Sequence, residues 1–373
     1  MSPLEVACGL PFGGTTVPLP ESDRHPARAL EDATVPALEG HGPALVAYSG
    51  GRDSALVLAA ATAAARRHGL PEPIPLTIRL PGVAVANEDA WQERTVAHLG
   101  LREWEFVTVT DELDLLGPLA RDILERHGPF WPANAHFIGL LLQRAAGGTL
   151  MTGEGGDDMF AWWRWQRAAD LLAGRARRRP RDLLTVSAAL APPAVRRRIA
   201  RRSLGDRPRL PWLTPRGQAM YARQLAGSAD APRRWDRVLA WMSGRRSMTV
   251  TADTLAVLGE DAGARILSPL LAPAFLGAVA AHGGRHGLGD RTATLRGLFA
   301  ALLPDEVLTR QDKATFGPAF FGPASRSFAR DWDGGGIDAA LVDAGALRRT
   351  WLAERVHWQS SDLIHRCWLH ERT

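Results

Sequence analysis

Ser49-Gly50-Gly51-Arg52-Asp53-Ser54 stands between a short apolar run, residues 44–48, and an alanine-rich run, residues 55–67. The first run has the length and side chains of a buried strand, and the second is made of helix formers. The hexapeptide is therefore predicted to join a strand to a helix. Two adjacent glycines let the backbone approach a ligand closely, and the N–H groups at the helix start attract an anion. We predict that this turn binds phosphate. The alternative is a plain glycine turn before a helix.

The rest of the chain alternates short apolar runs with helix-forming stretches. After a helix at 54–68, the pattern predicts strands at 74–80, 104–110 and 149–153, and helices at 88–99, within 113–127 and at 134–146. Strands separated by helices predict an α/β fold with a doubly wound parallel sheet, which binds its ligand at the carboxyl ends of the strands.

The C-terminal part of the chain is predicted to be largely helical. Amphipathic stretches indicate helices at 212–225, 232–247, 252–258, 271–281 and 292–303, and two more within 346–370. Near the start, residues 26–34 begin with a proline and predict one short helix that lies against the core. Tryptophans here and after the second glycine turn are expected to be packing groups, namely Trp162, Trp165, Trp351, Trp358 and Trp368.

A second glycine-rich turn, residues 152–158, follows the strand at 149–153 and carries acidic side chains. Carboxylates beside a polyphosphate repel it unless a divalent cation lies between them. Mg²⁺ prefers one or two carboxylates together with phosphate oxygens and water. We therefore predict Asp53 and Asp157 as the magnesium ligands. Taken alone, this turn is also compatible with a surface turn that caps a helix.

The two turns together resemble the synthetase domain of asparagine synthetases and their relatives, which include β-lactam synthetases and the macrolactam synthetases of lasso peptides. Two later stretches extend the resemblance. Residues 268–273 are similar to the family's Pro-Phe-Leu-Asp segment, although Ala272 replaces its aspartate. Residues 294–313 are similar to the stretch that carries the family's catalytic lysine. The resemblance runs from about residue 44 to 316 and implies an adenine nucleotide alpha hydrolase-like fold.

The resemblance implies an enzyme that cleaves ATP to AMP and pyrophosphate in order to activate a carboxylate. It assigns Lys313 and Glu154 as catalytic residues, with Lys313 closing over the site as pyrophosphate leaves. It places Gly153 near the nucleotide. The first turn would hold the pyrophosphate part of ATP through Ser49, Gly50, Gly51, Asp53 and Ser54.

The composition independently supports a catalytic role for Lys313. Of the 45 lysine and arginine residues, Lys313 is the single lysine. A catalytic ammonium group is not replaced by guanidinium without loss, so a chain that otherwise uses arginine has a reason to keep one lysine. The alternative is a solvated surface charge.

Two features bear on which relative this chain resembles. Glu154 stands where the β-lactam synthetases have a tyrosine, and the amide-forming members have glutamate there. The family's glutaminase domain begins with a cysteine nucleophile, whereas Ser2 follows Met1 here and only about forty residues precede the sheet. We expect a standalone synthetase whose nitrogen comes from free ammonia, from an amine substrate, or from a separate glutaminase or peptide partner.

Composition also limits the class of protein. Cys8 and Cys367 are the two cysteines and lie far apart, which excludes a zinc ribbon or a thioredoxin-like pair and predicts inert thiols. No secretory signal or membrane span is evident, so we expect a cytoplasmic protein without a membrane partner. Residues 164–209 are rich in arginine. We interpret them as solvated helix faces, with a docking surface for a partner or leader peptide as the alternative, and we do not expect a nucleic-acid partner.

We divide the chain into an N-terminal extension (1–40), an ATP-binding α/β core (41–175) and a helical substrate-side region packed on the same domain (176–373). The predicted function is an AMP-forming amide synthetase of specialised metabolism that transfers a small-molecule or peptide carboxylate to an amine or ammonia. One alternative is a lasso-type macrolactam cyclase. Another, of a different class, is a tRNA-modifying ATP pyrophosphatase.

Overall fold

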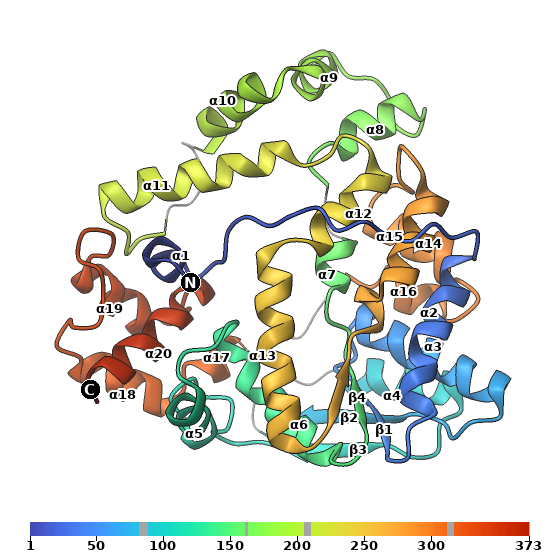
Figure 1. Cartoon of the computed structure of the whole chain (residues 1–373), viewed down its shortest axis with the longest axis horizontal. Coiled ribbons are helices and arrows are strands. Elements are labelled where there is room, and N and C mark those ends of the chain that lie inside the picture. The colour runs from blue at the N-terminus through green and yellow to red at the C-terminus, as the bar shows by residue number, and fades with distance from the viewer. Residues whose placement is uncertain (82–88, 161–162, 205–209, 312–316, 373) are drawn as a thin grey trace.

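A five-stranded sheet forms the centre of the computed structural model, which describes residues 1–372 apart from 82–88, 161–162, 205–209 and 312–316 (Figure 1). All four strand pairs are parallel, and the strand order is β3-β2-β1-β4-β5. The strands are β1 (Ala44–Ala47), β2 (Ile74–Arg79), β3 (Glu105–Thr108), β4 (Thr149–Met151) and β5 (Arg265–Leu267). The predicted doubly wound α/β fold is confirmed. β5 was not predicted, because it has only three residues and begins with an exposed arginine, so it forms no apolar run.

The order of the strands creates a crevice beside β1. The chain runs from β1 outward through β2 to β3, and then returns to the other side of β1 as β4. Leu45 of β1 is therefore paired with Ile74 on one side and with Leu150 on the other. Connections that leave β1 and β4 in opposite directions open a ligand crevice at the carboxyl ends of these strands.

The helices predicted up to residue 146 are present close to their predicted positions, as α2 to α6, and further helices are added to them. They are α1 (Pro3–Cys8), α2 (Pro26–Leu38), α3 (Arg52–His68), α4 (Asp89–Leu99), α5 (Pro118–His127), α6 (His136–Arg144), α7 (Gly156–Met159), α8 (Gln166–Leu172), α9 (Asp182–Leu190) and α10 (Pro193–Leu204). The predicted helix at 26–34 is present as α2, which packs against α3 as expected.

The second half contains α11 (Pro215–Ala226), α12 (Trp235–Ser243), α13 (Arg246–Ala262), α14 (Pro273–Gly283), α15 (Arg291–Phe299), α16 (Asp305–Thr309), α17 (Gly317–Phe320), α18 (Pro323–Asp331), α19 (Ala344–Leu352) and α20 (Ser361–His370). The single helix predicted at 232–247 is wrong, because the chain breaks at Gly244. A Cβ atom there would lie 1.6 Å from the carbonyl oxygen of Thr15, and the Thr15 N–H donates to the Gly244 carbonyl at 2.9 Å. The crossing N-terminal segment therefore requires the break.

Two apolar cores cover the two faces of the sheet. Val46 and Met151 belong to the core with α2, α3 and α14. Leu45 and Leu150 point the other way and belong to the core with α6, α13 and α20. Successive side chains of β1 and β4 point to opposite faces of the sheet, so these two buried strands contribute to both cores.

Most of the predicted packing groups are buried. Trp165, Trp351 and Trp368 lie in these cores, whereas the prediction for Trp358 is wrong, since that side chain is 62% exposed. Trp162 lies outside the described residues. Cys8 and Cys367 are both buried, as the prediction of inert thiols requires, and burial raises the pKa of Cys8 to about 12.

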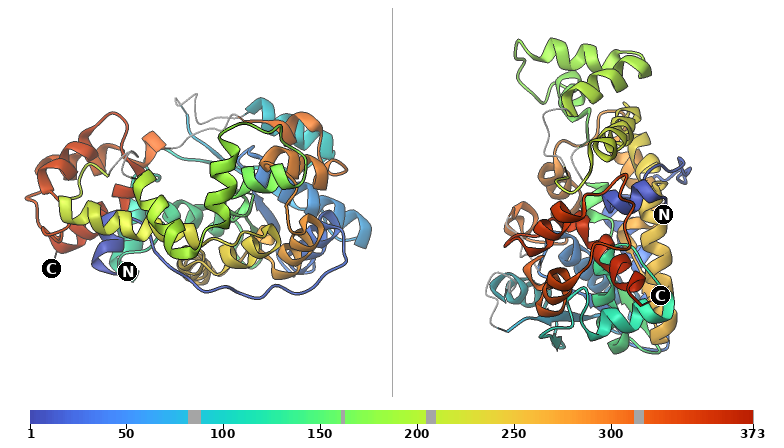
Figure 2. Two further views of the ribbon diagram at one scale, coloured as in Figure 1. Left: turned by 90° about the horizontal axis from the view of Figure 1, so that it is seen from above. Right: turned by 90° about the vertical axis from the view of Figure 1, so that its left-hand side faces the viewer.

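The helices far from the sheet form two groups. Figure 1 shows α18, α19 and α20 beside α1 and α5, at the end of the molecule where the two termini lie. Figure 2 shows α8, α9 and α10 projecting from the body of the protein. The crevice is shaped by the sheet and by nearer elements, among them α3, α6, α15 and α17.

Candidate active site

The first predicted turn has the geometry of an anion site. Gly51 precedes α3 and no side chain caps this helix start. Gly50 has a φ of 89°, which favours glycine. The Ser54 hydroxyl donates to the Gly51 carbonyl at 3.0 Å and lies 3.2 Å from the Ser49 hydroxyl. The serines therefore fix the turn from within and leave the N–H groups of the first helical turn toward the crevice.

The second turn packs directly onto the first. A Cβ atom at Gly153 would lie 2.9 Å from the backbone nitrogen of Ser54, and one at Gly156 would lie 2.3 Å from the Asp53 carboxyl carbon. Glycine is thus required at both positions for the turns to touch. This contact brings Asp53 and Asp157 to one place, as the sequence predicted.

An arginine from the far end of the chain joins the two acidic turns. The guanidinium of Arg291, the first residue of α15, donates to both Asp53 oxygens at 2.6 Å and to one oxygen of Asp157. Burial on its own would lower the pKa of Arg291, but the charges and hydrogen bonds of Asp53 and Asp157 outweigh it and raise this pKa. Arg291 was not among the predicted site residues, because arginines are common in this chain and no local pattern marks this one.

The donor set at this position fits a magnesium ion. Asp53 and Asp157 contact the same guanidinium, so their carboxylates face one small volume beside the phosphate-binding turn. In the described part of the chain, no group of three or more His, Cys, Asp or Glu side chains is placed to hold a metal. Two carboxylates with phosphate oxygens and water are what Mg²⁺ uses at nucleotide sites. Asp53 and Asp157 as its ligands stay a prediction.

Two further arginines hold the first turn against the C-terminal half. Arg310 is buried, donates to the Gly50 carbonyl at 2.8 Å, and stacks over the Trp91 ring with 4.9 Å to its centroid. Arg52 donates to the Thr292 hydroxyl at 3.1 Å. Burial, and next the charge of Arg291, lower the pKa of Arg52. These contacts couple the turn to α15 and to the end of α16.

The turns open into a cavity of about 780 Å³. Charged side chains of both turns line it, together with Arg291, Arg310, Gly153 and Glu154. An apolar wall comes from α6, α17 and the segment before α5, through Leu113, Phe137, Ile138, Leu141 and Phe320. The Phe137 and Phe320 rings pack with their centroids 6.0 Å apart. A ligand with a charged and an apolar part matches this shape.

Lys313 lies outside the described residues, so its predicted role stays a prediction. Gln311 and Gly317, the described residues that flank the stretch 312–316, line this cavity. Glu154 also lines it, and its N–H donates to the Thr152 hydroxyl at 3.3 Å.

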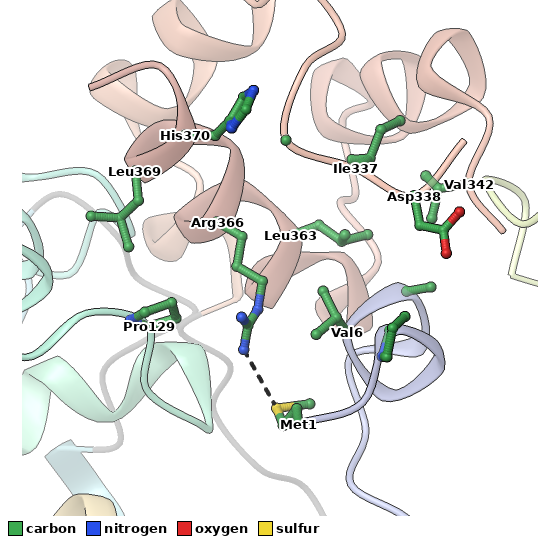
Figure 3. Close-up of a pocket in the computed structure, with 13 residues that line it drawn as sticks. Met1, Val6, Pro129, Ile337, Asp338, Val342, Leu363, Arg366, Leu369 and His370 are labelled. Carbon is green, nitrogen blue, oxygen red and sulfur yellow. Dashed lines mark hydrogen bonds between the residues drawn. The ribbon is translucent and has the colours of Figure 1, made fainter. Parts of the chain in front are cut away.

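A second cavity, of about 480 Å³, lies between α1 and α20 (Figure 3). Val6, Leu363 and Leu369 line it, and Arg366 extends toward Met1. Arg366 donates to the buried Asp362 on its own helix at 3.0 Å. None of the predicted site residues that the structure describes borders this cavity, so we assign the chemistry to the crevice.

The described residues of the arginine-rich region do not present exposed aromatic side chains for stacking on bases. Trp163 and Trp165 are buried, and their indole N–H groups donate to the carbonyls of Pro232 and Ala231. The large exposed side chains of α9 are leucines, Leu183, Leu184 and Leu190. This surface lacks the aromatic platform of single-strand binding proteins among the described residues.

The fold and the crevice define the class of protein. A parallel α/β sheet with an uncapped glycine turn after one strand and an acidic glycine turn after its neighbour is a nucleotide-binding arrangement. The family model for asparagine synthase matches residues 26–369, and the chain belongs to that family. It is thus an ATP-dependent ligase of the asparagine synthetase type, a group that forms amide bonds. A search of curated proteins finds no match. None of the described helices has the length and apolar character needed to cross a bilayer.

Proposed function

We propose that this ligase uses magnesium-bound ATP to adenylylate a carboxylate of specialised metabolism, and then transfers the acyl group to an amine or ammonia. One observation carries the proposal. The two glycine turns and Arg291 meet at a cavity that apolar side chains of α6 and α17 also line. The charged lining suits a triphosphate, and the apolar lining suits an acid with an apolar body.

The reaction balances in two steps. An oxygen of the substrate carboxylate attacks the α-phosphorus of ATP, the bond from that phosphorus to the bridging oxygen breaks, and pyrophosphate leaves. The amine nitrogen then attacks the acyl carbon, the bond to the AMP oxygen breaks, and the nitrogen loses a proton. Enclosure protects the mixed anhydride from water.

The chain's own residues have distinct parts in these steps. The N–H groups at the start of α3 hold the pyrophosphate part of ATP, between Ser49 and Ser54. Asp53 and Asp157 hold Mg²⁺, which supplies charge neutralisation of the polyphosphate when it is bound. Lys313 neutralises charge as pyrophosphate departs. Glu154, at the cavity wall, accepts the proton that the amine loses.

The apolar wall of the cavity indicates which class of carboxylic acid the enzyme prefers. Aspartate would bring a second carboxylate, which needs a charged or polar partner when it is buried. The side chains of Phe137, Ile138 and Phe320 offer none. We therefore expect an acid with an aliphatic or aromatic body to be preferred over aspartate.

ATP–pyrophosphate exchange with classes of acid tests the proposal. Aspartate, apolar amino acids, aryl or fatty acids and linear peptides are supplied separately with Mg²⁺ and ATP. We expect exchange with an apolar acid at least about tenfold faster than with aspartate, since one or two extra apolar groups in a pocket give that discrimination. Asp53→Asn should abolish it. Preference for aspartate, or AMP formation with no acid at all, would contradict the proposal. Exchange confined to linear peptides would favour macrolactam formation.

The matched control for the Asp53 variant is Arg126→Gln. Arg126 bridges two aspartates, Asp122 and Asp261, at an exposed site outside the crevice. Its loss should leave exchange unchanged. A general effect of breaking an arginine–aspartate cluster would appear in both variants.

Gel shift with bulk tRNA separates the proposal from the tRNA-modifying class. The family match and the buried Trp163 and Trp165 lead us to expect weak binding that disappears at 200 mM salt. Tight binding at that salt concentration would favour tRNA as the substrate.

A further inference from the structure

Arg291 occupies the position that the proposed magnesium ion would need. Its guanidinium contacts Asp53 and Asp157 together, and these are the two carboxylates assigned to the metal. Asp53 and Arg291 are mostly buried, with 14% and 22% of their side chains exposed, whereas Asp157 is 57% exposed. A divalent cation and the guanidinium cannot both lie between the same oxygens.

A cation between the two carboxylates stabilises them. Two like charges that face each other at a partly buried site repel, and a cation between them removes the repulsion. Arginine suits this place because its planar fork donates to two carboxylates at once. The same fork also matches phosphate.

The surroundings let Arg291 change partner while its backbone stays fixed. As the first residue of α15 it follows Asp290, whose carboxylate caps the helix by accepting from the Ala293 N–H at 2.9 Å. Arg52 holds the next residue, Thr292, at 3.1 Å. The Nε atom of Arg291 is buried and has no hydrogen-bond partner among the described residues, and the side chain lines the nucleotide cavity. The guanidinium therefore has an unused donor and lies beside the predicted phosphate position.

We propose that Arg291 is an exchangeable counter-ion: it pairs with Asp53 and Asp157 while the site is empty, and moves to the phosphates of ATP when magnesium takes the carboxylates. The inference rests on the magnesium site of the proposed function. It makes Arg291 a positioning residue for the metal and a binding residue for the nucleotide.

This exchange couples the two ligands. Without nucleotide, metal must displace Arg291 and leave its guanidinium without an anion, so metal alone binds weakly. With nucleotide, the displaced guanidinium gains a phosphate partner. ATP and metal should then raise each other's affinity by the same factor, as linkage requires.

Binding of Mn²⁺, as a paramagnetic probe of the magnesium site, tests the inference without turnover. Free Mn²⁺ is measured by electron paramagnetic resonance with the full chain, with and without a nonhydrolysable ATP analogue. The variants are Arg291→Gln, Arg291→Lys and the matched control Arg126→Gln, which removes an arginine from an exposed aspartate pair. No carboxylate substrate is needed, so failure to find the acid leaves this test intact.

In the wild type we expect the analogue to tighten Mn²⁺ binding by at least about tenfold, the ordinary size of coupling between sites. Arg291→Gln removes the competing cation, so Mn²⁺ should bind about tenfold more tightly without nucleotide. It also removes a phosphate contact, so analogue affinity should fall about tenfold. Arg126→Gln should match the wild type.

Two results would overturn the inference. One is unchanged Mn²⁺ affinity of the nucleotide-free Arg291→Gln protein, which would make Arg291 a purely structural bridge. The other is unchanged affinity for the analogue. Should Arg291→Gln fail to fold, Arg291→Lys decides. Its ammonium keeps the charge but lacks the fork, so Mn²⁺ binding without nucleotide should be tighter than in the wild type, and equal binding would contradict the exchange.

Discussion

Replacing Gly156 by alanine tests whether contact between the two glycine turns creates the active site. The new Cβ atom would lie 2.3 Å from the Asp53 carboxyl carbon and 2.5 Å from its Oδ1 oxygen. Ordinary carbon contacts are about 3.5–4.0 Å, so Asp53 must move by more than about 1 Å. Arg291 holds Asp53 at 2.6 Å through both oxygens and resists that movement.

The expected effect falls mainly on activity. A displacement of about 1 Å in a catalytic constellation costs about 10²-fold in rate. We therefore expect Gly156→Ala to lower kcat/KM for ATP by about 100-fold in the pyrophosphate exchange assay. Overpacking should lower the free energy of unfolding by about 1–3 kcal/mol, measured by urea denaturation.

Gly297→Ala is the matched control for this substitution. Gly297 lies in α15, the helix that begins with Arg291, and a Cβ atom there meets nothing within 4 Å. Alanine in a helix interior should raise the free energy of unfolding by about 0.5–1 kcal/mol and leave kcat/KM unchanged. Wild-type kcat/KM in Gly156→Ala would refute the claim that the turns must touch. A similar loss in Gly297→Ala would show that the assay reports general perturbation.

Three further predictions concern other parts of the molecule. Lys313→Ala should lower kcat by at least about 10²-fold, because the transition state loses one charge partner. The affinity for a nonhydrolysable ATP analogue, measured by calorimetry, should change little. Equal losses of kcat and of analogue affinity would make Lys313 a general binding residue. Phe137→Ala should raise KM for the preferred apolar acid by about 10-fold and leave KM for ATP unchanged. A raised KM for ATP with an unchanged KM for the acid would instead place the nucleotide base on the apolar wall. Burial lowers the pKa of His365 from 6.5 to about 3, so the unfolded chain takes up a proton that the folded chain refuses. The stability due to neutral His365 is complete above about pH 6.5 and is lost as the pH falls toward 3. His365→Leu should therefore reduce the fall in unfolding free energy between pH 6 and pH 4 by about 1 kcal/mol per pH unit, and equal slopes in urea titrations would contradict this.

The local sequence was sufficient to predict the two glycine turns and their proximity in the fold. Alternating strands and helices imply a parallel sheet, and motifs that follow two strands reach the same edge of it. Asp53 and Asp157 meet for this reason, and the glycines at 153 and 156 allow the final approach. The prediction rested on chain geometry that holds for doubly wound sheets in general.

Long-range partners could not be predicted in the same way. Arg291 reaches Asp53 across 238 residues, and Arg310 reaches Gly50 across 260. In a chain with 45 basic residues, almost all arginine, nothing local distinguishes these two from solvated ones. The same limit explains Trp358, whose helical context resembles that of the buried Trp351 although its side chain faces solvent. Burial depends on which elements meet, and residue type alone does not determine it.

The charges around the crevice also explain why both a metal and a lysine are expected. Among the described residues that line it, Arg52, Arg291 and Arg310 are balanced by three acids, Asp53, Glu154 and Asp157. The described wall is thus neutral overall and cannot by itself compensate a triphosphate, which carries several negative charges. A divalent ion on the carboxylates supplies two positive charges, and Lys313 supplies one more. On this balance, the arginines mainly hold the acids and the turn in place while the nucleotide is absent, and the added cations carry the reaction.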